Sequence, residues 1–317
     1  MSNIAPELVL TSRWLNIIAG IALFAFGLVG NCFNIYIFTR PRFRRAPSVQ
    51  YLLAGSIANL IQLGQTLLPR ILGDGFGIPI IQSSTIHCQI RLTLAAVATL
   101  CSISYPCWAS FDHAVSTSQY ASTRHYYTSK RFVYCAIFGT VFFWFIVYVP
   151  STLHIRATKE VCAGSNYIIT CIYSYGISPA AYSILPIALI CYLNYRIVRN
   201  LQQMKRVNSI GVRNTRLVRQ VRRMLIPQLI VLIISGIPFS IQTIYSVGTM
   251  AMSKDSVRQA AEGVILNLVR LLFYLNYVCS FYVYIVKSSE IRHECGKMFG
   301  KRYPILPQGT VINGNER

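Results

Sequence analysis

The sequence predicts an all-α fold, a bundle of seven transmembrane helices with the N-terminus outside and a short amphipathic eighth helix. The first observation is composition: of 317 residues, 54% are hydrophobic and 12% are charged, about half the charged fraction of a typical soluble domain. The second is the recurrence of apolar runs of roughly 20 residues, long enough to cross a hydrocarbon core of about 30 Å. The third is that basic residues gather between these runs. The bilayer is therefore the expected solvent and the first expected partner.

The expected spans are, in order, about 14–38, 48–72, 87–111, 131–150, 173–195, 224–248 and 263–286. They divide the chain into a short extracellular N-terminus (1–13), a transmembrane domain (14–286), and a cytoplasmic eighth helix with a short tail (287–317). The first 13 residues lack the basic n-region and cleavage site of a signal peptide, so the first span is expected to act as its own signal anchor.

The orientation follows from the basic residues. If the N-terminus is outside, most of the 30 Lys and Arg residues fall in the inner loops and the tail, as the positive-inside rule requires. The net charge of +21 does not predict a nucleic-acid partner, because the charges are not spread along one face of a folded domain. The sequence therefore predicts a multi-pass plasma-membrane protein.

The eighth helix is expected after Tyr284. Apolar residues recur there at helical spacing, with basic residues elsewhere, as in a helix lying on a membrane surface; they are Ile291, Cys295, Met298 and Phe299. Two interpretations of Cys295 remain open, a palmitoylation site and a plain apolar contact.

Most of the expected spans contain a short motif with a polar residue, a cysteine or a proline. The first span holds Gly30-Asn31, and the second holds SIANL, with Asn59. Cys88 opens the third span, which ends in the triplet Asp112-His113-Ala114. Proline kinks follow in the fifth and sixth spans, the latter in the motif SGIP, and the seventh ends in SFYVY, followed by KSSEIR.

These motifs resemble those of the rhodopsin-like (family 1, class A) G-protein-coupled receptors, over about residues 14 to 300. Several of the family's switch residues are altered, so the sequence is identified as a divergent member. The resemblance implies two groups of residues: a switch group for G-protein coupling, namely Asp112, His113, Pro238 and Tyr284, and a polar group in the core, namely Asn31, Asn59, Ser102 and Ser280. Asn59 stands where the family has an acid that helps to hold sodium, so no sodium site is expected.

The resemblance also implies a disulfide between Cys88 and the second outer loop, which contains Cys162 and Cys171. Cys162 is favoured, because Cys171 lies close enough to Pro186 to belong to the fifth helix.

Arg91 and Arg270 are expected near the outer ends of the third and seventh spans. A charge at membrane depth usually faces a cavity or a partner, and an Arg offers a bidentate fork to an anion. We therefore expect an anionic small molecule or a peptide carboxylate as ligand, with polar contacts from Gln242, Asn267 and Tyr274. Equally open is that Arg91 extends outward to the membrane surface and that Arg270 pairs with Glu262.

Other ligand classes are disfavoured. Ala95 stands where amine receptors carry an acid, and Tyr274 stands where opsins carry the lysine that holds retinal.

The function favoured by the sequence is a receptor that couples an extracellular ligand to a heterotrimeric G protein. The alternative is a seven-span protein that binds a ligand or partner without signalling, because His113 replaces the triplet's arginine. A transporter is less favoured, since no internal repeat is seen. An enzyme is not expected, because no metal-ligand cluster lies in the spans, and no cofactor or metal is expected.

Overall fold

The computed structural model describes residues 4–41, 43–78, 84–118, 120–157, 162–206 and 212–298. Within them, six helices are long and apolar enough to cross a membrane. They are α1 (Ile4–Phe38), α4 (Thr85–Ser116), α6 (Lys130–Leu153), the helical stretch Tyr167–Asn200, Ile226–Gly248 of α9 (Val212–Gly248), and α10 (Ser256–Lys287). The chain is thus a multi-pass helical membrane protein.

The expected second span forms a helical segment that is interrupted by π turns. α2 (Pro47–Gln62) is followed by η1 (Leu63–Leu67), α3 (Leu68–Arg70) and η2 (Ile71–Gly75). Pro69 has no N–H to donate to the carbonyl of Gln65 one turn earlier, so the regular α-helical ladder is broken here. The wider π turns on either side continue the helix past the break.

The expected fifth span is interrupted in the same way. The helical stretch that contains it is longer than the expected 173–195: it begins with α7 (Tyr167–Cys171), continues through η3 (Ile172–Ile177) and η4 (Ala180–Ile184), and ends with α8 (Leu185–Arg206). Pro179 and Pro186 flank η4, and each removes one backbone donor from the helix. A proline-free sequence would not need these turns.

Helix α4 lies at the centre of the bundle. It packs against α2, α6, α8 and α9, and 56% of its most apolar stretch is buried, compared with 17% in α6. Helices α1 and α10 pack along each other, on the side of α2 that faces away from α4. Of the six long helices, α6 is therefore the one most exposed to lipid. α4 is the central helix, which contacts several of the other helices.

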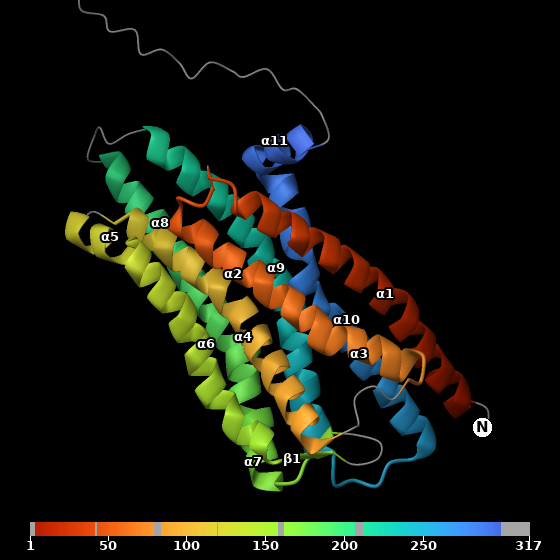
Figure 1. Cartoon of the computed structure of the whole chain (residues 1–317). Coiled ribbons are helices and arrows are strands. Elements are labelled where there is room, and N and C mark those ends of the chain that lie inside the picture. The colour runs from red at the N-terminus through yellow and green to blue at the C-terminus, as the bar shows by residue number, and fades with distance from the viewer. Residues whose placement is uncertain are drawn as a thin grey trace, which may run out of the picture.

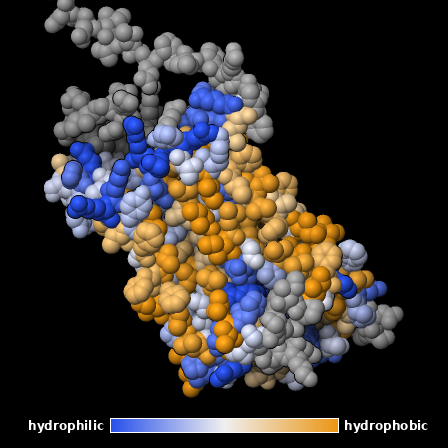
Figure 2. Space-filling model, viewed as in Figure 1, coloured by the Kyte–Doolittle hydropathy of each residue, from blue (hydrophilic) through white to orange (hydrophobic). Residues whose placement is uncertain are grey.

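The two ends of the bundle carry different elements (Figure 1). The start of α1, the strands and α7 lie at one end, which we call the α7 end; α5 (Ala121–Tyr127) and α11 (Ser289–Met298) lie at the other, the α11 end. The strands β1 (Ile155–Ala157) and β2 (Cys162–Gly164) form an antiparallel hairpin in which Ala157 pairs with Cys162. In the space-filling view, hydrophobic side chains cover the middle of the visible face and hydrophilic ones gather towards both ends (Figure 2), as expected for a membrane-embedded surface.

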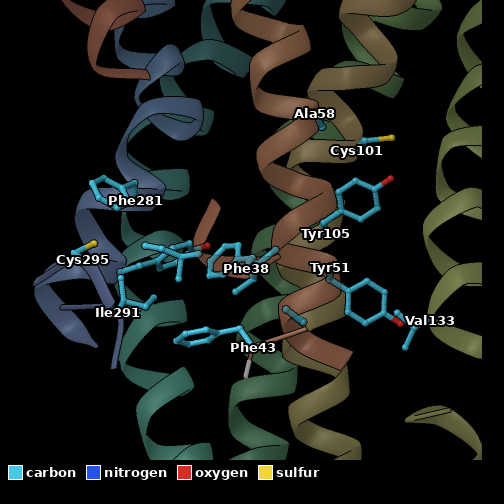
Figure 3. Packing of buried hydrophobic residues seen from close by; sticks show 14 of the residues in the cluster. Phe38, Phe43, Tyr51, Ala58, Cys101, Tyr105, Val133, Phe281, Ile291 and Cys295 are labelled. Carbon is cyan, nitrogen blue, oxygen red and sulfur yellow. The ribbon is translucent and has the colours of Figure 1, made fainter. Parts of the chain in front are cut away.

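The core near the α11 end joins α1, α2, α4, α10 and α11 (Figure 3). Phe38 and Tyr284 pack ring to ring with centroids 6.0 Å apart. Ile291 and Cys295 of α11 are buried in the same cluster, and Tyr51 extends towards Val133 of α6. The apolar face of α11, with Ile291 and Cys295, therefore packs against the bundle.

Three differences from the expected elements concern the two ends of the chain and one loop. α1 begins at Ile4, so most of the expected N-terminal segment is helical. The short helix α5 was not expected. The eighth helix is present as α11, but Met298 is 39% exposed, and Phe299 lies outside the described residues.

Candidate functional site

We call the helical stretch from α2 to η2, Pro47–Gly75, the second segment. A cavity of about 230 Å³ lies between this second segment, α4, η4, α9 and α10. We call it the arginine pocket; the polar residues that line it are Gln62, Thr66, Arg70, Thr99, Tyr182, Arg270 and Tyr274. Two of the expected ligand residues, Arg270 and Tyr274, are therefore in one pocket, and Arg91 lies close enough to Tyr274 to interact with it electrostatically.

Arg91 is directed towards the second segment. Its Nη1 donates to the carbonyl of Gln65 at 3.3 Å, and this is the carbonyl that Pro69 leaves without a helical donor. Its Nε is buried without a hydrogen-bond partner among the described residues. The structure therefore places Arg91 against the neighbouring helix and not outward at the membrane surface.

Arg270 is not paired with Glu262. That carboxylate is held instead by Lys254 at 2.5 Å and Arg258 at 2.9 Å, and its Oε1 also accepts from the hydroxyl of Tyr245. Among the described residues, no acid lies within ion-pair distance of Arg270. The open interpretation of Arg270 as the partner of Glu262 was therefore wrong.

Gln242 and Asn267 do not line the arginine pocket. The amide of Gln242 donates to Ser246 on its own helix at 3.3 Å. The amide of Asn267 donates to the hydroxyl of Ser12 on α1, in a separate cavity of about 530 Å³ between α1 and α10. The two residues therefore do not share a cavity with Arg270 and Tyr274, because the rotation of each helix about its axis is set by packing and not by hydropathy. Their expected contact with a ligand stays a prediction.

The sequence interpretation missed Arg70. This residue is on α3, lines the pocket, and interacts electrostatically with both Arg91 and Arg270. Its Nε is 3.6 Å from Oδ2 of Asp74, and its Nη1 is buried without a hydrogen-bond partner among the described residues. The signal was present, since Arg70 falls within the expected second span and a charge there is costly.

Three of the four expected core polar residues, Asn31, Asn59 and Ser102, lie along one buried chain of hydrogen bonds, and Ser280 belongs to a separate pair beside it. The amide of Asn31 donates to the carbonyls of Gly27 and Tyr277, both at 2.8 Å. The amide of Asn59 donates to Oδ1 of Asn31 at 2.9 Å, and the hydroxyl of Ser102 donates to Oδ1 of Asn59. One turn further along α1, Asn34 donates to Ser280 at 3.2 Å. This polar chain joins α10, α1, α2 and α4 in the middle of the bundle.

Asp112 and His113 are both buried near the α11 end of α4. Ser48, in the first turn of α2, interacts with the Asp112 carboxylate through its backbone N–H and its hydroxyl, as expected for an acid at a helix N-terminus. Oδ1 of Asp112 and Nε2 of His113 have no hydrogen-bond partner among the described residues. The two side chains do not form an ion pair with each other within the described part of the chain.

Pro238 and Tyr284 lie where the sixth and seventh spans meet other helices. Two residues before Pro238, Gly236 is so close to η4 that a Cβ there would lie 3.1 Å from the carbonyl oxygen of Tyr182. The hydroxyl of Tyr284 donates to Oε1 of Gln228 at 3.0 Å, so α10 is tied to α9 towards the α11 end.

The cysteines are distributed as follows. Cys88 at the start of α4 is joined to Cys162 of β2 by a disulfide with a Cα–Cα distance of 6.2 Å, and Cys171 is a free thiol. Cys295 is 6% exposed, and burial raises the pKa of its thiol, with a smaller contribution from the Glu294 carboxylate. Burial of Cys295 favours the apolar contact over palmitoylation in this conformation. Among the described residues, no group of three or more His, Cys, Asp or Glu residues is placed to hold a metal ion.

No family model matches this sequence, and no curated protein is significantly similar to it.

Proposed function

We propose that this chain is a seven-span receptor related to the rhodopsin-like G-protein-coupled receptors. In this proposal the second segment, Pro47–Gly75, also crosses the membrane and brings the number of spans from six to seven. The α7 end faces outside, and the α11 end faces the cytoplasm. The successive segments run in alternating directions between the two ends (Figure 1), which supports this assignment. The basic composition of the loops at the α11 end supports the orientation.

The observation that carries the proposal is the position of α4. This one central helix lines the arginine pocket at Thr99, enters the polar chain at Ser102, and holds Asp112 at the α11 end. A ligand that binds one arrangement of the pocket better than another shifts the populations of the whole bundle. Because α4 contacts most of its neighbours, a small displacement of it changes the surface at the α11 end, where the G protein would bind.

We infer that the ligand is an anion, because Arg70 and Arg270 line the pocket and Arg91 lies close enough to interact with Arg70. Among the described residues, Asp74 is the one acid paired with any of these three arginines. All three side chains are partly buried, where a cation without a counter-ion is costly, and an anionic ligand relieves that cost. The pocket is smaller than the 300–1,000 Å³ typical of drug-sized sites. A small molecule therefore fits better than an inserted peptide.

The test is guanine-nucleotide exchange on purified heterotrimeric G proteins, with the receptor in lipid nanodiscs. We expect basal exchange above that of empty nanodiscs, and a rise in exchange on addition of a pool of small organic anions. Arg270→Gln should abolish the rise, whereas Arg258→Gln, a half-exposed arginine already paired with Glu262, should preserve it. Equal responses of the two variants would contradict the assigned pocket.

The second candidate function is a ligand-binding membrane protein that does not signal. It is favoured by one observation, the buried His113 in place of the family's triplet arginine. Binding of an anion without any nucleotide exchange, across a panel of G-protein subtypes, would establish this alternative over the receptor.

The topology has a separate test. Epitope tags at the two termini should be detected in intact cells only for the N-terminal tag, and for both tags after permeabilisation. Detection of both tags in intact cells would mean an even number of crossings, which would exclude the second segment as a span.

A further inference from the structure

Arg70 and Asp74 form an ion pair at the wall of the arginine pocket. They lie one turn apart on the second segment, with Nε and Oδ2 separated by 3.6 Å. The Asp74 side chain is 53% exposed and that of Arg70 is 21% exposed. Asp74 lines the neighbouring cavity between α1 and α10, whereas Arg70 lines the arginine pocket. The pair therefore separates the two cavities.

The charges around the pocket do not balance. Arg70, Arg91 and Arg270 are close enough for Arg70 to interact electrostatically with the other two. Asp74 is the one acid within ion-pair distance of any of them among the described residues. Two positive charges therefore remain without an acidic partner. Mutual repulsion of like charges at a partly buried site favours binding of a compensating anion.

The donors of the pocket are also incompletely used. Arg70 Nη1 and Arg91 Nε are buried and have no hydrogen-bond partner in the described part of the chain. An unpaired buried donor on a charged group costs more than a neutral one. Arg70 lines the pocket together with Arg270, and Arg91 lies near both Arg70 and Tyr274, so a small ligand with two acidic groups can bind more than one of these cations.

The local backbone explains why Arg70 reaches this position. The short α3 lies between the π turns η1 and η2, and Gln62, Thr66 and Arg70 all line the pocket. Short π segments within helices occur frequently at functional sites. The interrupted segment around Pro69 thus carries a cation that lines the pocket.

We propose that the pocket selects a small dianion, such as a short dicarboxylate, that Arg70 is one of its binding residues, and that Asp74 is an internal counter-ion which the ligand displaces from Arg70. This inference rests on the proposed anion-binding function of the same pocket. In the empty state Asp74 holds Arg70 through a partly exposed pair, which is weak enough to be exchanged. On binding, a ligand carboxylate takes the place of Asp74 at Arg70, with the second carboxylate between Arg91 and Arg270.

The experiment measures binding without a G protein, so that it stands apart from the signalling proposal. Purified receptor in chloride-free detergent solution is titrated with unbranched dicarboxylates of four to six carbons and with monocarboxylates of equal length. Binding is followed as the rise in the midpoint of thermal unfolding, which increases with ligand concentration above the dissociation constant. We expect the dicarboxylates to stabilise the protein at concentrations at least about tenfold below those of the monocarboxylates.

Three variants test the roles of the two side chains. Asp74→Asn should lower the half-saturating dicarboxylate concentration roughly two- to fivefold, because it removes a competitor of the strength of a partly exposed ion pair. Arg70→Gln should raise that concentration by about tenfold or more. Arg258→Gln, on the same side of the bundle but outside the pocket, should leave it unchanged. If Arg70→Gln does not fold, Arg70→Lys keeps the charge, loses the bidentate fork and should show a smaller increase.

Equal potency of mono- and dicarboxylates would overturn the dianion, and weaker binding by Asp74→Asn would overturn the counter-ion. Dicarboxylate binding with the expected variant pattern, but no nucleotide exchange, would leave this inference standing and remove the signalling proposal. If a ligand stimulates nucleotide exchange but the Arg70 variants bind dicarboxylates normally, the signalling proposal stands and the role of Arg70 in this inference is removed.

Discussion

Asn59 is the residue on which the polar chain in the middle of the bundle depends. Its amide donates to Asn31 and its carbonyl accepts from Ser102, so it connects α1, α2 and α4. It is 5% exposed. Asn59→Leu keeps the branched shape and the number of side-chain heavy atoms, with bulkier methyl groups, and removes both hydrogen bonds; the control Asn34→Leu carries the same change in volume. The perturbation therefore tests whether this chain of contacts stabilises the bundle.

The expected loss can be worked out from these contacts. Interhelical hydrogen bonds in membrane proteins contribute about 0.6 kcal/mol each, which gives about 1.2 kcal/mol for the two. Oδ1 of Asn31 is then left buried without its donor, at a cost of ~1–3 kcal/mol. The hydroxyl of Ser102 can turn to a carbonyl of its own helix and adds little. We expect Asn59→Leu to lower the free energy of unfolding by about 2–4 kcal/mol.

Asn34→Leu is the matched control. Asn34 is also fully buried, one turn from Asn31 on α1, but it makes one longer bond to Ser280, and its Oδ1 has no partner among the described residues. Replacing it removes one weak hydrogen bond together with an unsatisfied oxygen, so the two effects nearly cancel. The expected change is within about 0.5 kcal/mol.

The assay is thermal and chemical unfolding of the purified protein in one detergent, followed by loss of the monodisperse species. A double-mutant cycle of Asn59→Leu with Ser102→Ala isolates the contact between these two side chains. Equal destabilisation by Asn59→Leu and Asn34→Leu, or a coupling energy near zero, would refute the reasoning.

Three further predictions concern other parts of the bundle. Gly236→Ala brings a Cβ to 3.1 Å from a carbonyl of η4 and should destabilise by ~1–3 kcal/mol, whereas Gly263→Ala, with open space around it, should be neutral or stabilising in the same unfolding assay. Cys162→Ser opens the disulfide to Cys88 across 74 residues and should cost roughly 2–5 kcal/mol, whereas Cys171→Ser, a free thiol, should cost far less. His113→Arg should change basal nucleotide exchange, because it introduces a permanent charge at a buried site.

Each of these has a contradicting outcome. Equal stability of the two glycine variants would mean that α9 and η4 are not in close contact. A stable Cys162→Ser protein would mean that the hairpin is held by other contacts. Basal exchange unchanged by His113→Arg, measured at equal surface expression, would remove His113 from the switch.

The sequence predicted the long helices well, because hydropathy over about 20 residues is a signal that tertiary contacts hardly alter. It predicted the polar chain through single residues: a buried Asn in a membrane helix needs a partner, and Asn31 and Asn59 are each other's partners. The residues of the pocket were predicted less well. Gln242 and Asn267 are on the expected helices but face elsewhere.

The missing information is the local rotation of the helices. Pro69 and the π turns beside it alter which side chains of the second segment face inward, so Arg70 enters the pocket. A hydrophobic pattern with a constant period of 3.6 residues cannot register such an interruption. The prolines themselves were visible in the sequence, but the helix face that each one redirects depends on which neighbouring group donates a hydrogen bond to the freed carbonyl.

Arg91 and Arg270 therefore differ, although the sequence suggested one role for both. Arg91 donates to the carbonyl that Pro69 frees, so it has a structural partner whether or not a ligand is bound, and its substitution should affect both stability and binding. Arg270 has neither an ion pair nor a hydrogen bond among the described residues, while it lines the pocket. A charged group held at a pocket without a protein partner is maintained at a cost that folding alone does not explain. Arg270 is thus the residue whose substitution separates ligand recognition from the architecture of the bundle.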